Sequence, residues 1–231
     1  MRVEDLIKID NIKKQINLIV CLPGGDYSSL FLECWTEFVG ACNKNNINLK
    51  ISSAEDAVVY YTRNKCLCGD VLSGKNQKPF GGQENYDYML WIDSDIVFEF
   101  NQFVKLLNHN LDIVSGIYMM KGSEYFATVK DWDIEHFRKN GYFNFLTEND
   151  IKNISSLIEV AYTGFGFMLV KHGVFEALEY PWFRPLWQKI SENVEDFSSE
   201  DVSFCRSIIE KGYKIYIDPT VRVGHEKRVV L

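Results

Sequence analysis

The stretch Tyr88-Met89-Leu90-Trp91-Ile92-Asp93-Ser94-Asp95-Ile96-Val97-Phe98 decides how this chain is interpreted. Its first half is a short run of large apolar residues, which predicts a buried strand. Side chains at positions i and i+2 of an extended segment point the same way, so Asp93 and Asp95 could converge on one cation or polar ligand at the strand end. A turn that uses Asp as a turn residue is the alternative. The apolar residues on both sides argue against a casual surface turn.

Strands and helices alternate on both sides of this stretch. Residues 16–22 and 47–51 predict strands, and apolar residues recur at helical spacing between them, with Asp26 or Ser28 as the helix cap. The further predicted elements are a helix at 98–108, strands at 112–118, 158–162 and 213–219, and a helix from Ser198 to Gly212. This order predicts an α/β fold with a mainly parallel central sheet flanked by helices. Residues 119–155 show no clean period and predict a smaller lobe, or a set of mobile loops, covering one side of the sheet.

Composition narrows the class of protein. The chain has 231 residues, 46% of them hydrophobic, which is enough for one sizeable core. Its formal net charge of -7 argues against a general nucleic-acid binder, which needs a basic surface. No apolar stretch reaches the length of a transmembrane segment. The six cysteines mostly lie in apolar patterns and no export signal is recognisable, so we expect reduced thiols and a cytoplasmic location.

Two features before the Asp-Ser-Asp stretch suit a nucleotide. Pro23-Gly24-Gly25 removes side-chain bulk where the first strand stops, and ligands of open α/β sheets lie outside such strand ends. An ordinary turn between strand and helix is the alternative. Arg63 beside Asn64 suits a diphosphate and a base edge, because guanidinium binds phosphate bidentately. An exposed helical arginine is the alternative there.

Four features after it are also candidates. Gly164 and Gly166 interrupt a strand-like apolar run, which indicates close approach by another group. Glu200 and Asp201 begin a helix, a position that capping and the helix dipole explain without chemistry. His225 follows a glycine in an alternating segment and could face a ligand. The aromatic residues around Trp182 suit either stacking on a sugar or ordinary core packing.

Taken together, these pieces resemble the GT-A glycosyltransferases over most of the chain. Asp93-Ser94-Asp95 resembles the Asp-X-Asp motif of that superfamily, and Ser199-Glu200-Asp201 resembles its X-Glu-Asp motif. The segment 163–167 is similar to its glycine-containing acceptor-side loop, and His225 to its C-terminal metal-binding histidine. The pair Arg63-Asn64 is similar to a nucleotide-contacting pair in many bacterial and viral members.

The resemblance implies one GT-A domain over residues 1–231, with a nucleotide-binding half at 1–118 and an acceptor-binding half at 119–231. It implies a nucleotide-sugar donor, with a UDP-sugar favoured, and a divalent cation, Mn²⁺ or Mg²⁺. Such a cation neutralises the departing diphosphate as a Lewis acid, and a histidine ligand favours Mn²⁺. The acceptor would be a hydroxyl on a glycan, a lipid-linked sugar or another molecule.

The resemblance also assigns roles to individual residues. Asp95 and His225 would hold the metal, and Asp93 would contact the ribose or reach the metal through water. The residues expected on the nucleotide and donor are Pro23, Gly24, Arg63, Asn64, Ser94 and Glu200, with Gly164 and Gly166 leaving room for the donor sugar and acceptor. Asp201 would be the general base of an inverting reaction.

Three alternatives stay open. In a retaining glycosyltransferase on the same fold, Asp201 would bind donor or acceptor instead. A sugar-1-phosphate nucleotidyltransferase would carry a glycine-rich loop with basic residues after its first strand, whereas Pro23-Gly24-Gly25-Asp26 is short and has none. A non-catalytic binding module would have no need to keep the acidic residues and His225.

Overall fold

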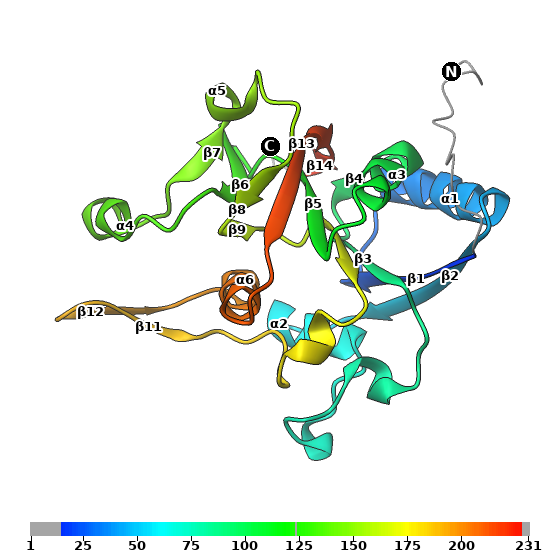
Figure 1. The fold of residues 1–231 in the computed structure, drawn as a ribbon, viewed down its shortest axis with the longest axis horizontal. Helices are drawn as coiled ribbons and strands as arrows, with labels where there is room; N and C mark the ends of the chain where they lie inside the picture. Colours follow the sequence, from blue (N-terminus) through cyan, green and yellow to red (C-terminus); the bar gives the residue numbers. More distant parts are fainter. Residues whose placement is uncertain (1–14, 123, 228–231) are drawn as a thin grey trace.

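A central sheet of seven strands organises the computed structural model, which describes residues 15–122 and 124–227 (Figure 1). In their order across the sheet, the strands are β2 (Ile47–Ala54), β1 (Ile16–Pro23), β3 (Tyr88–Ile92), β10 (Phe167–Lys171), β5 (Ile113–Ile117), β13 (Ile215–Arg222) and β8 (Ile158–Val160). The strands β10 and β8 run antiparallel to the others, whereas β1, β2, β3, β5 and β13 share one direction. The predicted α/β class with a mainly parallel sheet is confirmed, and the two reversed strands make the sheet mixed.

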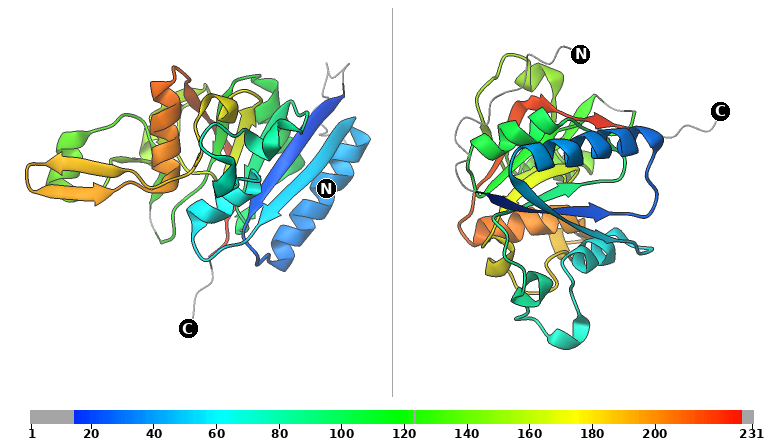
Figure 2. Two further views of the ribbon diagram at one scale, coloured as in Figure 1. Left: turned by 90° about the horizontal axis from the view of Figure 1, so that it is seen from below. Right: turned by 90° about the vertical axis from the view of Figure 1, so that its right-hand side faces the viewer.

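Helices cover both faces of this sheet (Figure 2). On one face α1 (Ser29–Lys44) and α3 (Phe100–Asn108) pack on Leu18, Val20 and Leu90. On the other, α2 (Val59–Cys66) and α6 (Glu200–Glu210) pack on Ile19, Cys21 and Trp91. Successive side chains of a strand point to opposite faces, so a sheet covered on both faces needs the continuous apolar runs seen in β1 and β3.

The caps and strand ends follow local rules. The Ser28 hydroxyl accepts a hydrogen bond from the backbone N–H of Phe31 at 3.0 Å, which fixes the start of α1 as predicted. Gly212, with φ of +89°, ends α6. Within β13, Asp218 accepts hydrogen bonds from Thr220 and pairs with Nε2 of His109 on the C-cap of α3 at 2.8 Å.

The predicted lobe has its own small sheet. It contains β6 (Tyr125–Val129), α4 (Ile134–Asn140), β7 (Phe145–Thr147) and α5 (Glu148–Ile151). The strand β6 pairs with β7 and with β9 (Tyr162–Thr163) in antiparallel fashion. This pairing places the lobe beside the β8–β13 side of the main sheet (Figure 1).

A hairpin that the sequence did not reveal projects from the body next to this lobe (Figure 2). It consists of β11 (Trp187–Ser191) and β12 (Val194–Phe197). The remaining short elements are β4 (Ile96–Val97), which pairs with β14 (Gly224–His225), and the 3-10 turns η2 (Val71–Ser73), η3 (Pro79–Gly82) and η4 (Phe175–Ala177). Among the helices within residues 15–122 and 124–227, none has the length and apolarity needed to cross a membrane.

Candidate functional site

The predicted site residues meet at one edge of the sheet. The parallel strands β1 and β3 end there at Pro23 and Ile92, and Asp93 follows directly. The antiparallel β10 begins at this edge, where Phe167 pairs with Ile92. After β13 the chain returns through β14, where His225 pairs with Ile96. Carboxyl ends of parallel strands lie at a common edge, so positions spread over the whole chain converge.

Asp95 and His225 are in direct contact at this edge. Nε2 of His225 lies 3.2 Å from Oδ2 of Asp95, although about 130 residues separate the two in sequence. Nδ1 of His225 donates to the carbonyl oxygen of Met119 at 2.7 Å, and the imidazole packs edge-on against Tyr118 with 5.0 Å between ring centroids. The backbone carbonyl therefore fixes the ring with Nε2 facing the carboxylate.

Each partner shifts the pKa of the other. Burial alone would lower the pKa of His225, but the hydrogen bonds to Asp95 and to the Met119 carbonyl outweigh it and raise that pKa. Burial would raise the pKa of Asp95, but hydrogen bonds from His225 and Lys227 outweigh it and lower the pKa to about 2. The site thus favours a carboxylate with positive charge beside it.

These two side chains fit a divalent cation. Metal-binding histidines commonly donate their second ring N–H to a carbonyl, as His225 does to Met119. A carboxylate oxygen suits Mg²⁺ or Mn²⁺, and an imidazole nitrogen beside it favours Mn²⁺. Within the described part of the chain, no group of three or more His, Cys, Asp or Glu side chains is placed to hold a metal. A cation here would therefore depend on phosphate and water for its other ligands, as Mg²⁺ often does.

Lys227, which was not among the predicted site residues, also contacts this carboxylate. Its Nζ lies 2.5 Å from Oδ2 of Asp95, and the N–H of Glu226 donates to the carbonyl of Asp95 at 2.7 Å. A cavity of about 270 Å³ lies beside this contact. Its lining consists of Asp26, Ser28, Ser94, Asp95, Glu226 and Lys227.

Arg63 joins the two acidic motifs. It is 4% exposed, with Nη2 at 3.0 Å from Asp93 and Nε at 3.2 Å from Glu200. Its guanidinium also lies 5.1 Å from the ring centroid of Phe165. Burial would lower the pKa of Arg63, but the two carboxylates outweigh it and raise that pKa. Burial raises the pKa of both Asp93 and Glu200, although the charge of Arg63 acts to lower it. The Arg63 guanidinium is thus the positive charge that holds these two carboxylates in place.

Asn64 departs from the predicted contact with a nucleotide base. Its Nδ2 donates to the carbonyl oxygens of Tyr60 and Phe183 at 2.7 and 2.6 Å, and its Oδ1 accepts from the backbone N–H of Phe183 at 3.3 Å. One amide hydrogen bond thus stays within α2 and the other, with the Oδ1 contact, holds the distant backbone of Phe183 in place. This geometry gives Asn64 a structural role.

The glycines make room for protein rather than for a sugar. A Cβ at Gly164 would collide with the hydroxyl of Tyr118, and one at Gly166 with its ring. That hydroxyl accepts a hydrogen bond from the N–H of Gly166 at 3.2 Å. A Cβ at Gly24, which has φ of +128°, would lie 3.0 Å from Oγ of Ser94. The close approach that the glycines indicated is real, but the approaching groups are side chains of this chain.

Asp201 lies beside the same cluster. Its Oδ2 accepts a hydrogen bond from the hydroxyl of Tyr162 at 2.8 Å, and its Oδ1 accepts from the Ser199 hydroxyl. The charge of Asp201 contributes to the raised pKa of Asp93 and Glu200. Asp201 is only partly buried, whereas its neighbour Glu200 is buried and held by Arg63.

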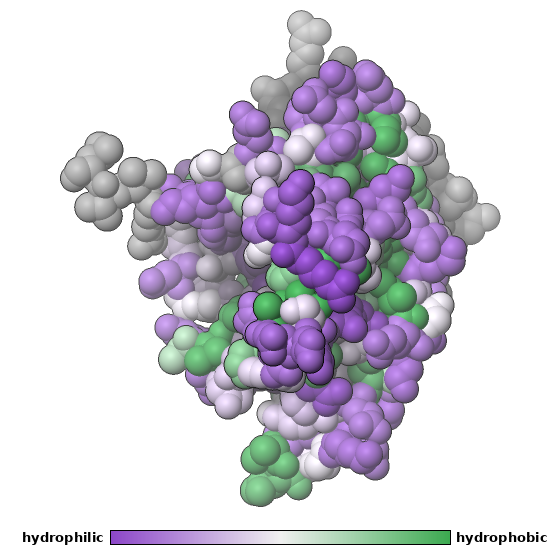
Figure 3. Space-filling view, turned by 90° about the vertical axis from the view of Figure 1, so that its left-hand side faces the viewer, coloured by the Kyte–Doolittle hydropathy of each residue, from purple (hydrophilic) through white to green (hydrophobic). Residues whose placement is uncertain are grey.

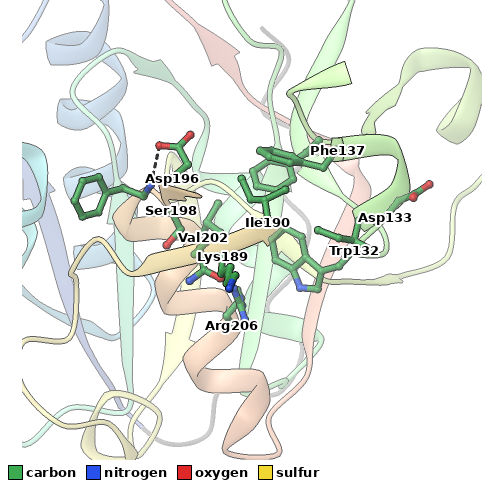
Figure 4. Close-up of a pocket in the computed structure, with 13 residues that line it drawn as sticks. Trp132, Asp133, Phe137, Lys189, Ile190, Asp196, Ser198, Val202 and Arg206 are labelled. Atoms are coloured by element: carbon green, nitrogen blue, oxygen red, sulfur yellow. Dashed lines mark hydrogen bonds between the residues drawn. The ribbon is translucent and has the colours of Figure 1, made fainter. Parts of the chain in front are cut away.

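A second cavity, of about 320 Å³, lies between α4, the β11–β12 hairpin and α6 (Figure 4). Trp132, Phe137, Ile190, Val202 and Arg206 are among its lining residues. The lobe segment is far in sequence from the hairpin and α6, which follow one another directly, so no local pattern could have identified the cavity. Of the two interpretations left open for the aromatic residues around Trp182, core packing holds for Trp182 itself, which is 3% exposed.

Comparison with known proteins extends only to the fold. No protein-family model matches the chain, and no curated protein matches it. Its structure is similar to the crystal structure of A197 from STIV, with a TM-score of 0.51 and 18% sequence identity over 94% of this chain and 97% of that chain. It is also similar to the inositol-1-phosphate CTP transferase from T. maritima, with a TM-score of 0.43 and 9% identity over 92% of this chain and 90% of that one. The first likeness shows a shared α/β fold, and the second is too distant to support an inference.

Proposed function

We propose that the chain is a metal-dependent glycosyltransferase of the GT-A type, which moves a sugar from a nucleotide-diphosphate sugar to an acceptor hydroxyl. The contact between Asp95 and His225 at the carboxyl edge of the sheet carries the proposal. It pairs a strand-end carboxylate with a distant imidazole whose second nitrogen is already bonded to a carbonyl. A purely structural ion pair would not need to lie beside a cavity and a second acidic cluster.

The cavity beside Asp95 is the proposed site of the nucleotide, with a UDP-sugar as the favoured donor. Its wall includes Ser28, which caps the N-terminus of the 16-residue helix α1. The positive end of a helix dipole favours a diphosphate, and so does the nearby ammonium of Lys227. On this proposal residues 1–118 form the nucleotide-binding half and 119–231 the acceptor half, with 1–14, 123 and 228–231 outside the described residues.

Asp201 is the proposed general base of an inverting transfer. It would take the proton of the acceptor hydroxyl as that oxygen attacks the anomeric carbon, while the Tyr162 hydroxyl orients its carboxylate. Mn²⁺ or Mg²⁺ held by Asp95 and His225 would offset the negative charge of the departing nucleoside diphosphate. Arg63 would keep Asp93 in place at the donor side through their ion pair.

Thermal unfolding with UDP, GDP or CDP, each with Mn²⁺, Mg²⁺ or EDTA, tests this proposal. At a concentration of about 100 times Kd, a nucleotide that binds only with metal should add about 2.7 kcal/mol, or roughly 5–10 °C for a chain of this size. Asp95→Asn should abolish the shift, whereas the charge-matched control Glu37→Gln, on the exposed face of α1, should keep it.

Three results would count against the proposal. They are the absence of a shift with every nucleotide, an equal shift in EDTA, and a full shift in the Asp95→Asn protein. Release of pyrophosphate from CTP or UTP in the presence of a sugar 1-phosphate would favour the nucleotidyltransferase alternative.

A further inference from the structure

The cavity between the lobe and the hairpin has the size of a ligand site. Its volume of about 320 Å³ falls at the lower end of the range for small-molecule pockets. In Figure 3, a small apolar area shows near the middle of this face among hydrophilic side chains. Trp132 remains 38% exposed there, so part of a large aromatic side chain is accessible to a ligand.

The walls of the cavity are apolar and its margins are charged. Figure 4 shows Trp132 and Phe137 on the lobe side, facing Ile190 of the hairpin. Both signs of charge are present, with Asp133 and Asp196 as acids and Lys189 and Arg206 as bases. The cavity therefore offers aromatic surface together with both acceptors and donors of hydrogen bonds.

This combination matches a saccharide better than a lipid chain or an anion. A sugar ring presents C–H groups that pack on aromatic faces, and its hydroxyls both donate to carboxylates and accept from Lys and Arg. A hydrocarbon chain would cover the charged groups without giving them partners, which is costly. An anion would meet two carboxylates as well as two cations.

The cavity also adjoins the proposed base. Val202, which lines it, follows Asp201 on the first turn of α6. Tyr162 donates its hydroxyl hydrogen to Asp201, and its ring lies 6.4 Å from that of Trp132 between centroids. One tyrosine thus connects the wall of the cavity to the carboxylate.

We propose that this cavity binds one sugar unit of the acceptor, with Trp132 as its stacking surface. That the cavity binds a saccharide follows from its walls; that the saccharide is the acceptor rests on the proposed function. The two statements can therefore fail separately.

A glycan microarray probed with the fluorescently labelled full-length chain tests saccharide binding without nucleotide or metal. The wild-type chain should retain a defined set of glycans. Calorimetric titration of the best-bound glycan should show Kd raised tenfold or more in Trp132→Ala. Lys189→Ala, at an exposed margin position, should raise Kd several-fold without affecting folding. Trp187→Ala, an exposed hairpin residue outside the cavity lining, should leave Kd within twofold.

Saccharide binding is overturned if no glycan is retained, or if Trp132→Ala and Lys189→Ala both bind as wild type does. It is also overturned if a fluorescent fatty acid, and no glycan, binds in a Trp132-dependent manner. If glycans bind as described but no nucleotide stabilises the chain, the saccharide site stands and the proposed function falls. If nucleotides bind with metal and no glycan does, the reverse holds.

Discussion

Replacing Arg63 with methionine should lower the free energy of unfolding by about 3–5 kcal/mol, because breaking a buried ion pair from one side leaves uncompensated charge. Arg63 is 4% exposed and contacts Asp93 at 3.0 Å and Glu200 at 3.2 Å. Its removal leaves two carboxylates close together, with Glu200 itself buried. For a chain of this length the loss corresponds to a fall in Tm of roughly 6–20 °C.

The loss should depend on pH in a defined direction. Burial already raises the pKa of Asp93 and Glu200 in the folded state, and without Arg63 both pKa values would rise further. The folded chain then holds protons at pH values where the unfolded chain, with carboxyl pKa values near 4, has released them. Stability of the variant therefore increases as pH falls toward about 4, so its deficit relative to wild type should shrink.

Urea unfolding followed by circular dichroism, at neutral pH and at about pH 5, measures both effects. The matched control is Arg63→Met combined with Asp93→Asn and Glu200→Gln, which neutralises the whole cluster and should recover most of the loss. A loss below about 1 kcal/mol, as for an exposed ion pair, would refute the reasoning. So would a loss that is the same at both pH values, or one that the combined variant fails to recover.

The remaining predictions concern Asp218, two glycines and Lys227. Asp218→Asn should cost about 1–3 kcal/mol at neutral pH in urea unfolding. Burial alone would raise the pKa of Asp218, but hydrogen bonds outweigh it and lower the pKa in the folded state. The stability that these hydrogen bonds contribute is therefore present above the unfolded pKa near 4 and is lost as pH falls below it. The free energies of unfolding of wild type and variant should then converge at low pH. Gly166→Ala should destabilise by about 1–3 kcal/mol because its Cβ meets the ring of a buried tyrosine, whereas Gly40→Ala, in a helix and with open space around it, should stabilise by about 0.5–1 kcal/mol. Lys227→Met should tighten Mn²⁺ binding about two- to fivefold in calorimetry, because the cation no longer has to displace one exposed ion pair to Asp95. Unchanged affinity would show that the lysine does not compete with the cation.

The sequence by itself determined the main strands and helices of the large sheet and the end of β3. The apolar run before Asp93 indicated β3 and its end at Ile92, and Ser28 was available to cap α1. Both signals are local, since hydrophobic periodicity and caps depend on residues a few positions apart. The same reasoning placed Asp93, Asp95 and Asp201 at element ends, where polar side chains can face a ligand.

Only the tertiary structure decided which of these groups meet. Arg63 pairs with residues 30 and 137 positions away, and that choice depends on how α2 and α6 pack on one face of the sheet. The glycines at 164 and 166 indicated a close neighbour, but only the packing of Tyr118 identified it. The cavity beside Trp132 needs the lobe, the hairpin and α6 together. Local spacing carries no information about such long-range partners, because sheet order and register are set by the burial of the whole core.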